Sequence, residues 1–276
     1  SPKFKSEIAD EPLQSAGVSL EVRNLRLDLG GRAVLAGLDF DVRAGEFVAL
    51  VGEVGSGKSQ LLLSLLGEAP ARFDLFRVNG LAADSLSLEQ RRRYLAYVPQ
   101  EGFIISTTLR DNVGFSYGLQ TDLDLRIQSA LQAAQFQTGI ENMPAGIDTE
   151  IGERGVNLSG GQRQRVGLAR AEYHDKPIVL LDDCLSALDI HTESALLKSL
   201  LLGSWASRTR ILVTHRLSVL PHVDRVVFLK KGKIVDQGRF DELVTRCAEF
   251  RTFAATVAAQ AQGAGAEKGE SDHVTH

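Results

Sequence analysis

The segment Gly52–Ser59, with the sequence GEVGSGKS, carries the residues of this chain best suited to bind phosphate. Its spacing is G-x-x-x-x-G-K-S, in which glycines let successive backbone N–H groups turn toward phosphate oxygens while Lys58 adds a positive charge. The candidate nucleotide-binding residues are therefore Gly52, Glu53, Val54, Gly55, Ser56, Gly57, Lys58, Ser59 and the following Gln60. By itself, such a loop indicates only that the protein binds a nucleotide.

A second candidate anion site lies downstream, in the sequence LSGGQRQR at Leu158–Arg165. Ser159 is suited to cap a helix that begins at Gly160 and Gly161, and the free backbone N–H groups at a helix N-terminus bind anions. One chain therefore carries two devices for binding phosphate.

Two carboxylates, Asp182 and Asp183, follow the apolar run Ile178–Leu181. In nucleotide-binding proteins with a phosphate loop, the last Ser or Thr of the loop ligates Mg²⁺, and an Asp at the end of a buried strand holds the shell of that ion. Ser59 and Asp182 are thus predicted metal ligands. The chain has no Asn-Lys-x-Asp sequence, which disfavours a guanine-specific GTPase.

The phosphate loop and LSGGQRQR, in this order and spacing, resemble the nucleotide-binding domain of ATP-binding-cassette (ABC) proteins over about residues 18 to 255. The resemblance implies ATP and Mg²⁺ as cofactors. It also implies a head-to-tail pair of domains, in which each nucleotide lies between the phosphate loop of one domain and the signature motif of the other. The signature residues here are Leu158, Ser159, Gly160, Gly161 and Gln162. One chain would therefore contribute to two nucleotide sites.

The resemblance assigns roles to residues outside these two motifs. Gln100, in YVPQ, matches the glutamine of the family that senses and ligates Mg²⁺, and His215, in LVTHRL, matches the switch histidine near the γ-phosphate. Together with Asp183 they form the predicted catalytic set. The segment Ser186, Ala187, Leu188 and Asp189 resembles the D-loop, which crosses the dimer interface.

Two positions depart from the pattern of the family. The family usually has Glu after the strand-terminal Asp, where it polarises the attacking water, but this chain has Asp183. A carboxylate one methylene shorter holds that water poorly, and small misplacements of catalytic groups can cost about 100-fold in rate. We therefore expect slow or absent hydrolysis at this chain's own site. Leu29 replaces the aromatic residue on which the family stacks adenine, so base recognition would rest on apolar contact or on Arg32, with weaker affinity and selectivity.

Other segments resemble one branch of the family. Thr149–Gly155 (TEIGERG) and Ser106–Val113 (STTLRDNV) are similar to ABC exporters, in which the first of them meets the coupling helices of the membrane domain. VGEVGSGKS, DDCLSALD and RTRILVTH resemble the first cassette of the multidrug-resistance-associated (MRP-like) branch, where Asp in place of Glu is typical. The resemblance implies an exporter cassette on the cytoplasmic face of a membrane, partnered by a transmembrane domain and a second nucleotide-binding domain. A regulatory, hydrolysis-deficient cassette and the ATPase subunit of an importer are the alternatives.

The elements that must position these residues follow from apolar periodicity. Val18–Leu29 and Val34–Val42 approximate apolar alternation and predict an antiparallel hairpin. Apolar runs that end in polar residues predict strands of a mostly parallel sheet, with those polar residues at its carboxyl edge. The predicted parallel strands are Phe47–Val51, Ile178–Leu181 and Arg210–Thr214; further strands are expected at Phe73–Val78 and Tyr94–Val98, a hairpin at Arg225–Val235, and helices at Ser59–Leu66, Leu123–Gln135 and Phe240–Ala259.

The predicted fold class is α/β, with a P-loop (RecA-like) core, an antiparallel β subdomain and a helical insertion, as in the ABC ATPase fold. The core would span residues 18–100 and 177–260, the helical subdomain with the signature 101–176, a linker 1–17 and a disordered tail 261–276.

Composition excludes some classes of function. No apolar run approaches the ~18 residues of a membrane helix. The net charge is -4 and basic residues are scattered among acids, so we expect no binding to nucleic acid. The chain begins Ser1-Pro2-Lys3 without Met, which suggests a piece of a longer polypeptide whose remainder would hold the membrane spans.

Overall fold

The computed structural model describes residues 17–83, 86–115, 121–153 and 155–271, which are built around two main β-sheets. The larger sheet has six strands in the order β12-β11-β3-β10-β9-β6. They are β3 (Phe47–Val51), β6 (Leu95–Val98), β9 (Ile178–Asp182), β10 (Thr209–Val213), β11 (Arg225–Lys230) and β12 (Lys233–Gly238). Only β11 and β12 pair antiparallel, as the predicted hairpin, so the expectation of a mostly parallel sheet is confirmed.

Both faces of this sheet are covered, and every residue of β3, β9 and β10 is buried. Along β3, Phe47, Ala49 and Val51 join one hydrophobic core, whereas Val48 and Leu50 join the other. Successive side chains of a strand point to opposite faces, so one apolar run serves both cores.

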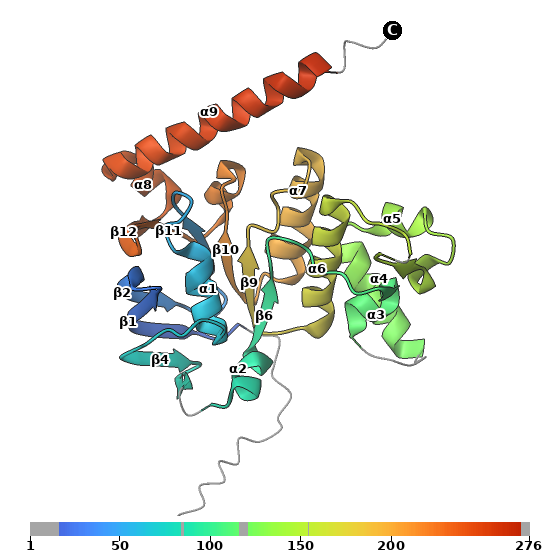
Figure 1. Ribbon diagram of the computed structural model, residues 1–276, viewed down its shortest axis with the longest axis horizontal. Coiled ribbons are helices and arrows are strands. Elements are labelled where there is room, and N and C mark those ends of the chain that lie inside the picture. The colour runs from blue at the N-terminus through green and yellow to red at the C-terminus, as the bar shows by residue number, and fades with distance from the viewer. Residues whose placement is uncertain (1–16, 84–85, 116–120, 154, 272–276) are drawn as a thin grey trace, which may run out of the picture.

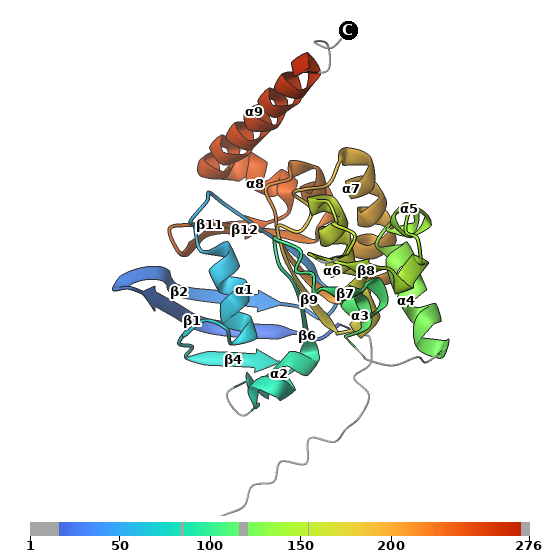
Figure 2. The same ribbon diagram turned by 45° about the vertical axis from the view of Figure 1, so that its right-hand side comes forward.

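The smaller main sheet covers one of those faces. Its strands, in the order β2-β1-β4-β5, are β1 (Leu20–Leu29), β2 (Arg32–Val42), β4 (Leu75–Val78) and β5 (Leu81–Ala82). The β1–β2 hairpin turns at Gly30 and Gly31, whose positive φ angles of 56° and 77° favour glycine. Helix α1 (Lys58–Leu66) packs its leucines into the core that the two sheets share (Figure 2).

Most of the helices lie on the other side of the large sheet (Figure 1). Helix α6 (Gly160–His174) contacts α3, α4 and β6. The remaining elements are α2 (Leu88–Tyr94), α3 (Leu109–Gly114), α4 (Thr121–Ala133), α5 (Gln137–Glu141), the 3₁₀-helices η2 (Gly146–Asp148) and η4 (Leu217–His222), α7 (Ile190–Leu196), the π-helix η3 (Leu197–Ser204), and the strand pair β7 (Thr107–Thr108) and β8 (Glu150–Ile151).

The C-terminal region differs from the expectation of one helix followed by a disordered tail. Helix α8 (Phe240–Arg246) ends at an extended Cys247, and α9 (Ala248–Ser271) follows in a new direction (Figure 1). The turn lets Phe250 pack edge-on against Phe228 of β11, with ring centres 5.6 Å apart. Helix α9 continues to Ser271, past residue 261, where the tail was expected to start. Residues 272–276, like residues 1–16 of the expected linker, lie outside the described residues.

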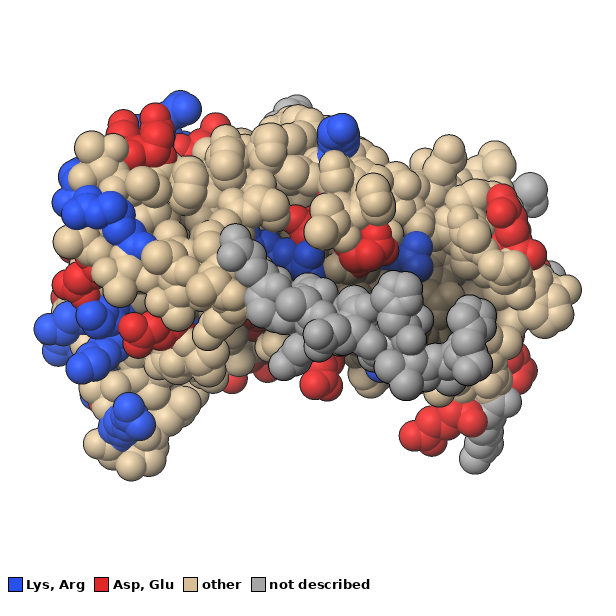
Figure 3. Space-filling view, turned by 90° about the horizontal axis from the view of Figure 1, so that it is seen from above, with Lys and Arg blue, Asp and Glu red and all other residues tan. Residues whose placement is uncertain are grey.

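None of the helices among the described residues is both long and apolar enough to cross a membrane. On the face shown in Figure 3, basic and acidic side chains are interspersed.

Candidate functional site

The phosphate loop connects the carboxyl end of β3 to the first turn of α1, where Ser59 and Gln60 lie. At two of its glycines there is no room for a side chain. A Cβ at Gly52 would come within 2.1 Å of the carbonyl oxygen of Leu229, and one at Gly57 within 2.7 Å of Leu35. Both also have positive φ, as does Gly55, so the strand-to-helix turn depends on glycine.

Lys58 is buried, with its ammonium group folded over the loop. It donates hydrogen bonds to the carbonyl oxygens of Gly52 and Glu53, both at 2.9 Å, and to Ser56 Oγ at 3.3 Å. Burial lowers the pKa of Lys58, and the negative charges of Asp183 and Asp182 oppose that effect. The ammonium group therefore contacts three residues of the loop, whereas the side chain of Val54 is exposed.

Ser59 and Asp182, the two predicted metal ligands, are in contact. Ser59 Oγ donates to Asp182 Oδ1 at 2.8 Å, and the hydroxyl of Tyr97 on β6 donates to Asp182 Oδ2 at 3.1 Å. Burial, with the charge of Asp182, raises the pKa of Tyr97, so its hydroxyl stays a donor. Sequence reasoning missed Tyr97. The signal for it was its place in the expected strand Tyr94–Val98, three residues before Gln100.

Asp183 and His215 follow two neighbouring strands, β9 and β10, at the same edge of the sheet. The backbone N–H of Asp183 donates to Val213 O at 2.9 Å, and the carboxyl group is half-buried with Oδ1 lacking a hydrogen-bond partner among the described residues. Burial raises the pKa of Asp183 to about 6, although a hydrogen bond from the backbone of His215 lowers it in part. Burial, together with the charge of Lys58, lowers the pKa of His215, which favours its neutral form.

Gln100 lies just after β6 and lines a cleft of about 1090 Å³ with residues of TEIGERG and of α6. Its side chain does not join the pair of Ser59 and Asp182 in the described structure. Its carbonyl oxygen instead accepts a hydrogen bond from Gln164 Nε2 at 3.0 Å. The structure therefore places Gln100 at the carboxyl edge of the sheet, directly after the strand that pairs with β9.

The signature forms the N-terminus of α6, as predicted. Ser159 Oγ accepts from the backbone N–H of Gln162 at 3.2 Å, and Gln162 Oε1 accepts from the N–H of Ser159 at 2.8 Å, which is a complete capping box. Leu158 is buried in the core. A cleft of about 320 Å³ runs between this helix end and the D-loop; it is lined by Ser159, Gly160, Gly161, Arg165, Ala187, Leu188, Asp189 and Thr192. None of these lining residues belongs to the phosphate loop, so the two phosphate-binding devices lie in different places.

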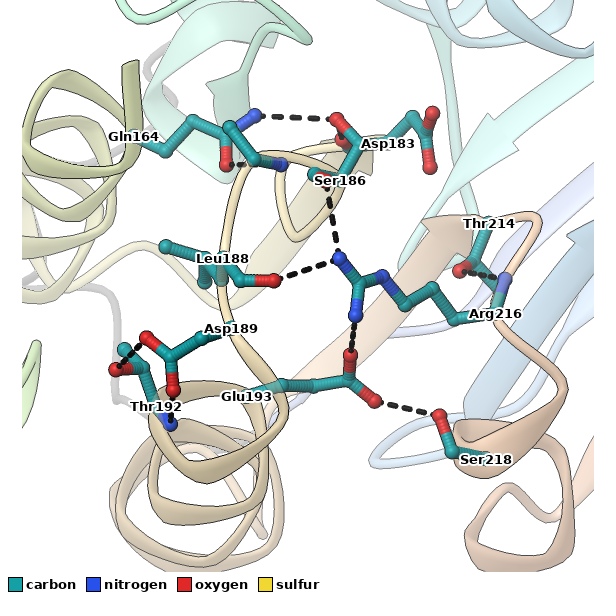
Figure 4. A network of polar contacts seen from close by, with 11 residues as sticks. Gln164, Asp183, Ser186, Leu188, Asp189, Thr192, Glu193, Thr214, Arg216 and Ser218 are labelled. Carbon is teal, nitrogen blue, oxygen red and sulfur yellow. Dashed lines mark hydrogen bonds and ion pairs between the residues drawn. The ribbon is translucent and has the colours of Figure 1, made fainter. Parts of the chain in front are cut away.

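The D-loop is held by side chains on both sides (Figure 4). Ser186 Oγ donates to the carbonyl oxygen of Asp183 at 2.7 Å, which ties the D-loop to the end of β9. Asp189 caps α7 by accepting from the hydroxyl of Thr192 at 2.7 Å and from its N–H at 2.9 Å, and these hydrogen bonds lower the pKa of Asp189 to about 2.

Leu29 lies at the tip of the β1–β2 hairpin, where it pairs with Arg32. The hairpin reaches the phosphate loop through Leu35, which faces Gly57. Leu29 itself is 40% exposed. The position expected to meet adenine therefore offers an aliphatic surface rather than an aromatic ring.

Comparisons with known proteins agree with this geometry. A family model described as ABC transporter matches residues 35–186. An ATP-dependent lipid A-core flippase of Ralstonia nicotianae is 41% identical over 220 residues, which cover 78% of this chain and 36% of the flippase. ABC transporter C family member 8 of Dictyostelium discoideum is 37% identical over 247 residues, covering 88% of this chain and 14% of that protein.

A solved structure of a bacterial Atm1-family ABC exporter with ATP bound superimposes with a TM-score of 0.81 at 30% identity, covering 93% of this chain and 46% of that one. This chain thus spans less than half the length of each of these three relatives. The match of the family model, the coverage of this chain by its relatives, and the strand–loop–helix and capped signature described above lead to one conclusion: this chain belongs to the ABC transporter family and has the ABC ATPase fold.

Proposed function

We propose that this chain is the ATP-binding cassette of a membrane exporter and couples ATP binding and hydrolysis to transport. The observation that carries the proposal is the contact between Ser59 and Asp182 beside a buried Lys58. The similarity to a lipid A-core flippase and to an Atm1-family exporter supports export rather than import. The cassette would lie on the cytoplasmic face of a membrane, against a transmembrane domain, and would pair head to tail with a second nucleotide-binding domain.

The residues present suit Mg²⁺ with ATP. The hydroxyl of Ser59 and the carboxylate of Asp182 are hard oxygen donors, and they already converge on one point. Gln100, on the same sheet edge, would complete the ligand set. When bound, Mg²⁺ neutralises phosphate charge. Lys58 and the backbone N–H groups of the loop would hold the phosphates, and neutral His215 would lie near the terminal phosphate.

Weak hydrolysis at this chain's own site belongs to the same proposal. Asp183 would have to act as the base for the attacking water, but its side chain is one methylene shorter than that of the Glu usual in the family and would hold that water poorly. The capped signature at Ser159–Gln162 is intact and would complete the nucleotide site of the partner domain. The chain's stronger catalytic contribution would therefore be made to the partner's site.

Two finer assignments follow from the same residues. The segment DDCLSALD at residues 182–189, and the similarity to a Dictyostelium ABC transporter C family member, support the first cassette of the MRP-like branch. We also assign residues 18–100 and 177–260 to the phosphate-loop core, and 101–176 to the helical subdomain. The second candidate function is a regulatory cassette that binds ATP and gates its partner without hydrolysis, and Asp183 is the observation that favours it.

Nucleotide binding to the isolated chain tests this proposal. We expect MgATP to bind the wild-type chain in a calorimetric titration and Lys58→Met to weaken binding by about tenfold or more, because a charge-assisted contact is lost. Lys198→Met, which removes an exposed lysine of η3 far from the loop in sequence, is the matched control and should bind like the wild type. If MgATP fails to bind, or if Lys58→Met binds as tightly as Lys198→Met, the proposal is wrong.

A further inference from the structure

Arg216, the residue after His215, reaches from the end of β10 to the D-loop (Figure 4). Its Nη2 donates to the carbonyl oxygens of Ser186, at 2.9 Å, and Leu188, at 2.7 Å. Its Nη1 forms an ion pair with Glu193 of α7 at 2.5 Å. One guanidinium group therefore joins the segment that carries His215 to two points of the D-loop and to the helix that follows it.

The ion pair gives Arg216 a fixed anchor. Glu193 is only 5% exposed, and its second carboxylate oxygen accepts from Ser218 Oγ at 2.5 Å. A carboxylate this deeply buried is costly to leave unpaired, so it holds the guanidinium in place. At its other end, the backbone N–H of Arg216 donates to Thr214 Oγ1 at 3.0 Å. The side chain of Arg216 thus connects the 214–216 segment to the D-loop and to α7.

Gln164 of α6 holds the D-loop from the opposite side. This side chain is 3% exposed; its Oε1 accepts from the N–H of Ala187 at 3.1 Å and its Nε2 donates to Ser186 Oγ at 3.2 Å. The same Nε2 reaches the carbonyl oxygen of Gln100. The D-loop therefore lies between one side chain from the signature helix and one from the segment of His215.

The shape of the guanidinium matters for this arrangement. Its planar fork presents several N–H donors at once and can span two carbonyl oxygens and a carboxylate, whereas a lysine ammonium acts as a compact point charge. Within the described part of the chain, none of the hydrogen bonds of Arg216 reaches the phosphate loop. Its effect on the nucleotide must therefore act through other residues.

We propose that Arg216 is a positioning residue that couples the segment of His215 to the D-loop. Nucleotide bound at this chain's own phosphate loop would shift that segment, and Arg216 would transmit the shift to Ser186 and Leu188. The conformation of the D-loop, which would contact the nucleotide site of the neighbouring domain, would then depend on whether this chain's own site holds nucleotide. This inference rests on the proposed function, because it needs MgATP at the phosphate loop.

Hydrogen exchange of the D-loop amides, measured on the whole chain, tests the coupling. The N–H groups of Ser186, Ala187 and Leu188 are all hydrogen-bonded, so their exchange reports the conformation of this loop. In the wild type we expect saturating MgATP to slow their exchange by about fivefold or more. In Arg216→Lys the slowing should fall below about twofold, although the affinity for MgATP stays within about twofold of wild type.

Arg225→Lys is the matched control, because Arg225 makes a similar fork to Glu46, Gln237 and the carbonyl oxygen of Asp41, away from the D-loop. It should keep the full response to MgATP. If Arg216→Lys unfolds, Glu193→Gln replaces it in the test. In Glu193→Gln the slowing of D-loop exchange by MgATP should be at most half that of the wild type.

Three results would overturn the proposal. They are a wild-type D-loop that ignores bound MgATP, a full response in Arg216→Lys or Glu193→Gln, and an equal loss in Arg225→Lys. Failure of the wild type to bind MgATP would be seen separately in the affinity measurement, and it would remove the proposed function together with this one.

Discussion

Burial sets the chemistry of single residues in this nucleotide site. It lowers the pKa of Lys58 and raises that of Asp183 to about 6, so both charged forms are held against a desolvation cost. Asp183 is still ionised at neutral pH, but its Oδ1 has no hydrogen-bond partner among the described residues. Under the proposed function Leu29 would add a second weakness, since it offers no aromatic face to a base.

Restoring an aromatic ring at position 29 should strengthen base recognition. We expect Leu29→Tyr to tighten MgATP binding by about fivefold, because stacking of a base on an aromatic side chain contributes about 1 kcal/mol or more. Leu81→Tyr is the matched control, because Leu81 is 41% exposed, close to the 40% of Leu29, but lies on β5 at the other edge of the sheet. Titration of both variants with fluorescent ATP measures the two affinities. Equal effects of the two substitutions would show that position 29 does not meet the base.

At the scale of secondary structure, helix α6 links the signature to the segment that follows β6. The two backbones nearly touch at Gly102, where a Cβ would come within 2.4 Å of the backbone of Arg163. Farther along the helix, a Cβ at Gly167 would meet Val98 Cγ1 at 3.4 Å, an ordinary contact. The contact at Gly102 thus sets how close α6 lies to the Gln100 segment.

These two glycines should respond differently to alanine. Gly102→Ala should lower the free energy of unfolding by about 2 kcal/mol, because α6 or the loop must move to relieve the overlap. Gly167→Ala should raise it by about 0.5 to 1 kcal/mol, because alanine is the better helix former and space is available. Urea unfolding monitored by circular dichroism measures both. A neutral Gly102→Ala would mean that the approach of the two segments is not tight.

Patterns within short stretches of sequence predicted the strands and helices that depend on those stretches alone. The apolar runs before Gly52 and Asp182, and the spacing of the loop glycines, are readable in short windows, and the structure has strands and a helix there. The break at Cys247 was missed because neither Pro nor Gly marks it; it arises from packing of Phe250 on a distant strand. The network around Arg216 was missed for a similar reason. Hydrogen bonds between segments far apart in sequence leave no periodic pattern.

At the scale of the whole molecule, the cleft at the signature is lined by no residue of the phosphate loop, and under the proposed function a second domain would complete each nucleotide site. The α1 side of the sheet holds the loop, while α6 carries the signature among the helices on the other side (Figure 1). With Asp183 at one site and an intact capping box at the other, the two contributions of this chain would be unequal under the proposed function. That inequality is the central claim of the proposed function.

Single-turnover hydrolysis of ATP tests this claim most directly. We predict a rate near background for the wild type and a rate about tenfold or more higher for Asp183→Glu, because the longer carboxylate can reach the attacking water. In Asp183→Glu/Ser159→Arg the gain should disappear, since the signature that completes each site comes from the neighbouring copy. A brisk wild-type rate that falls in Asp183→Glu would contradict the account.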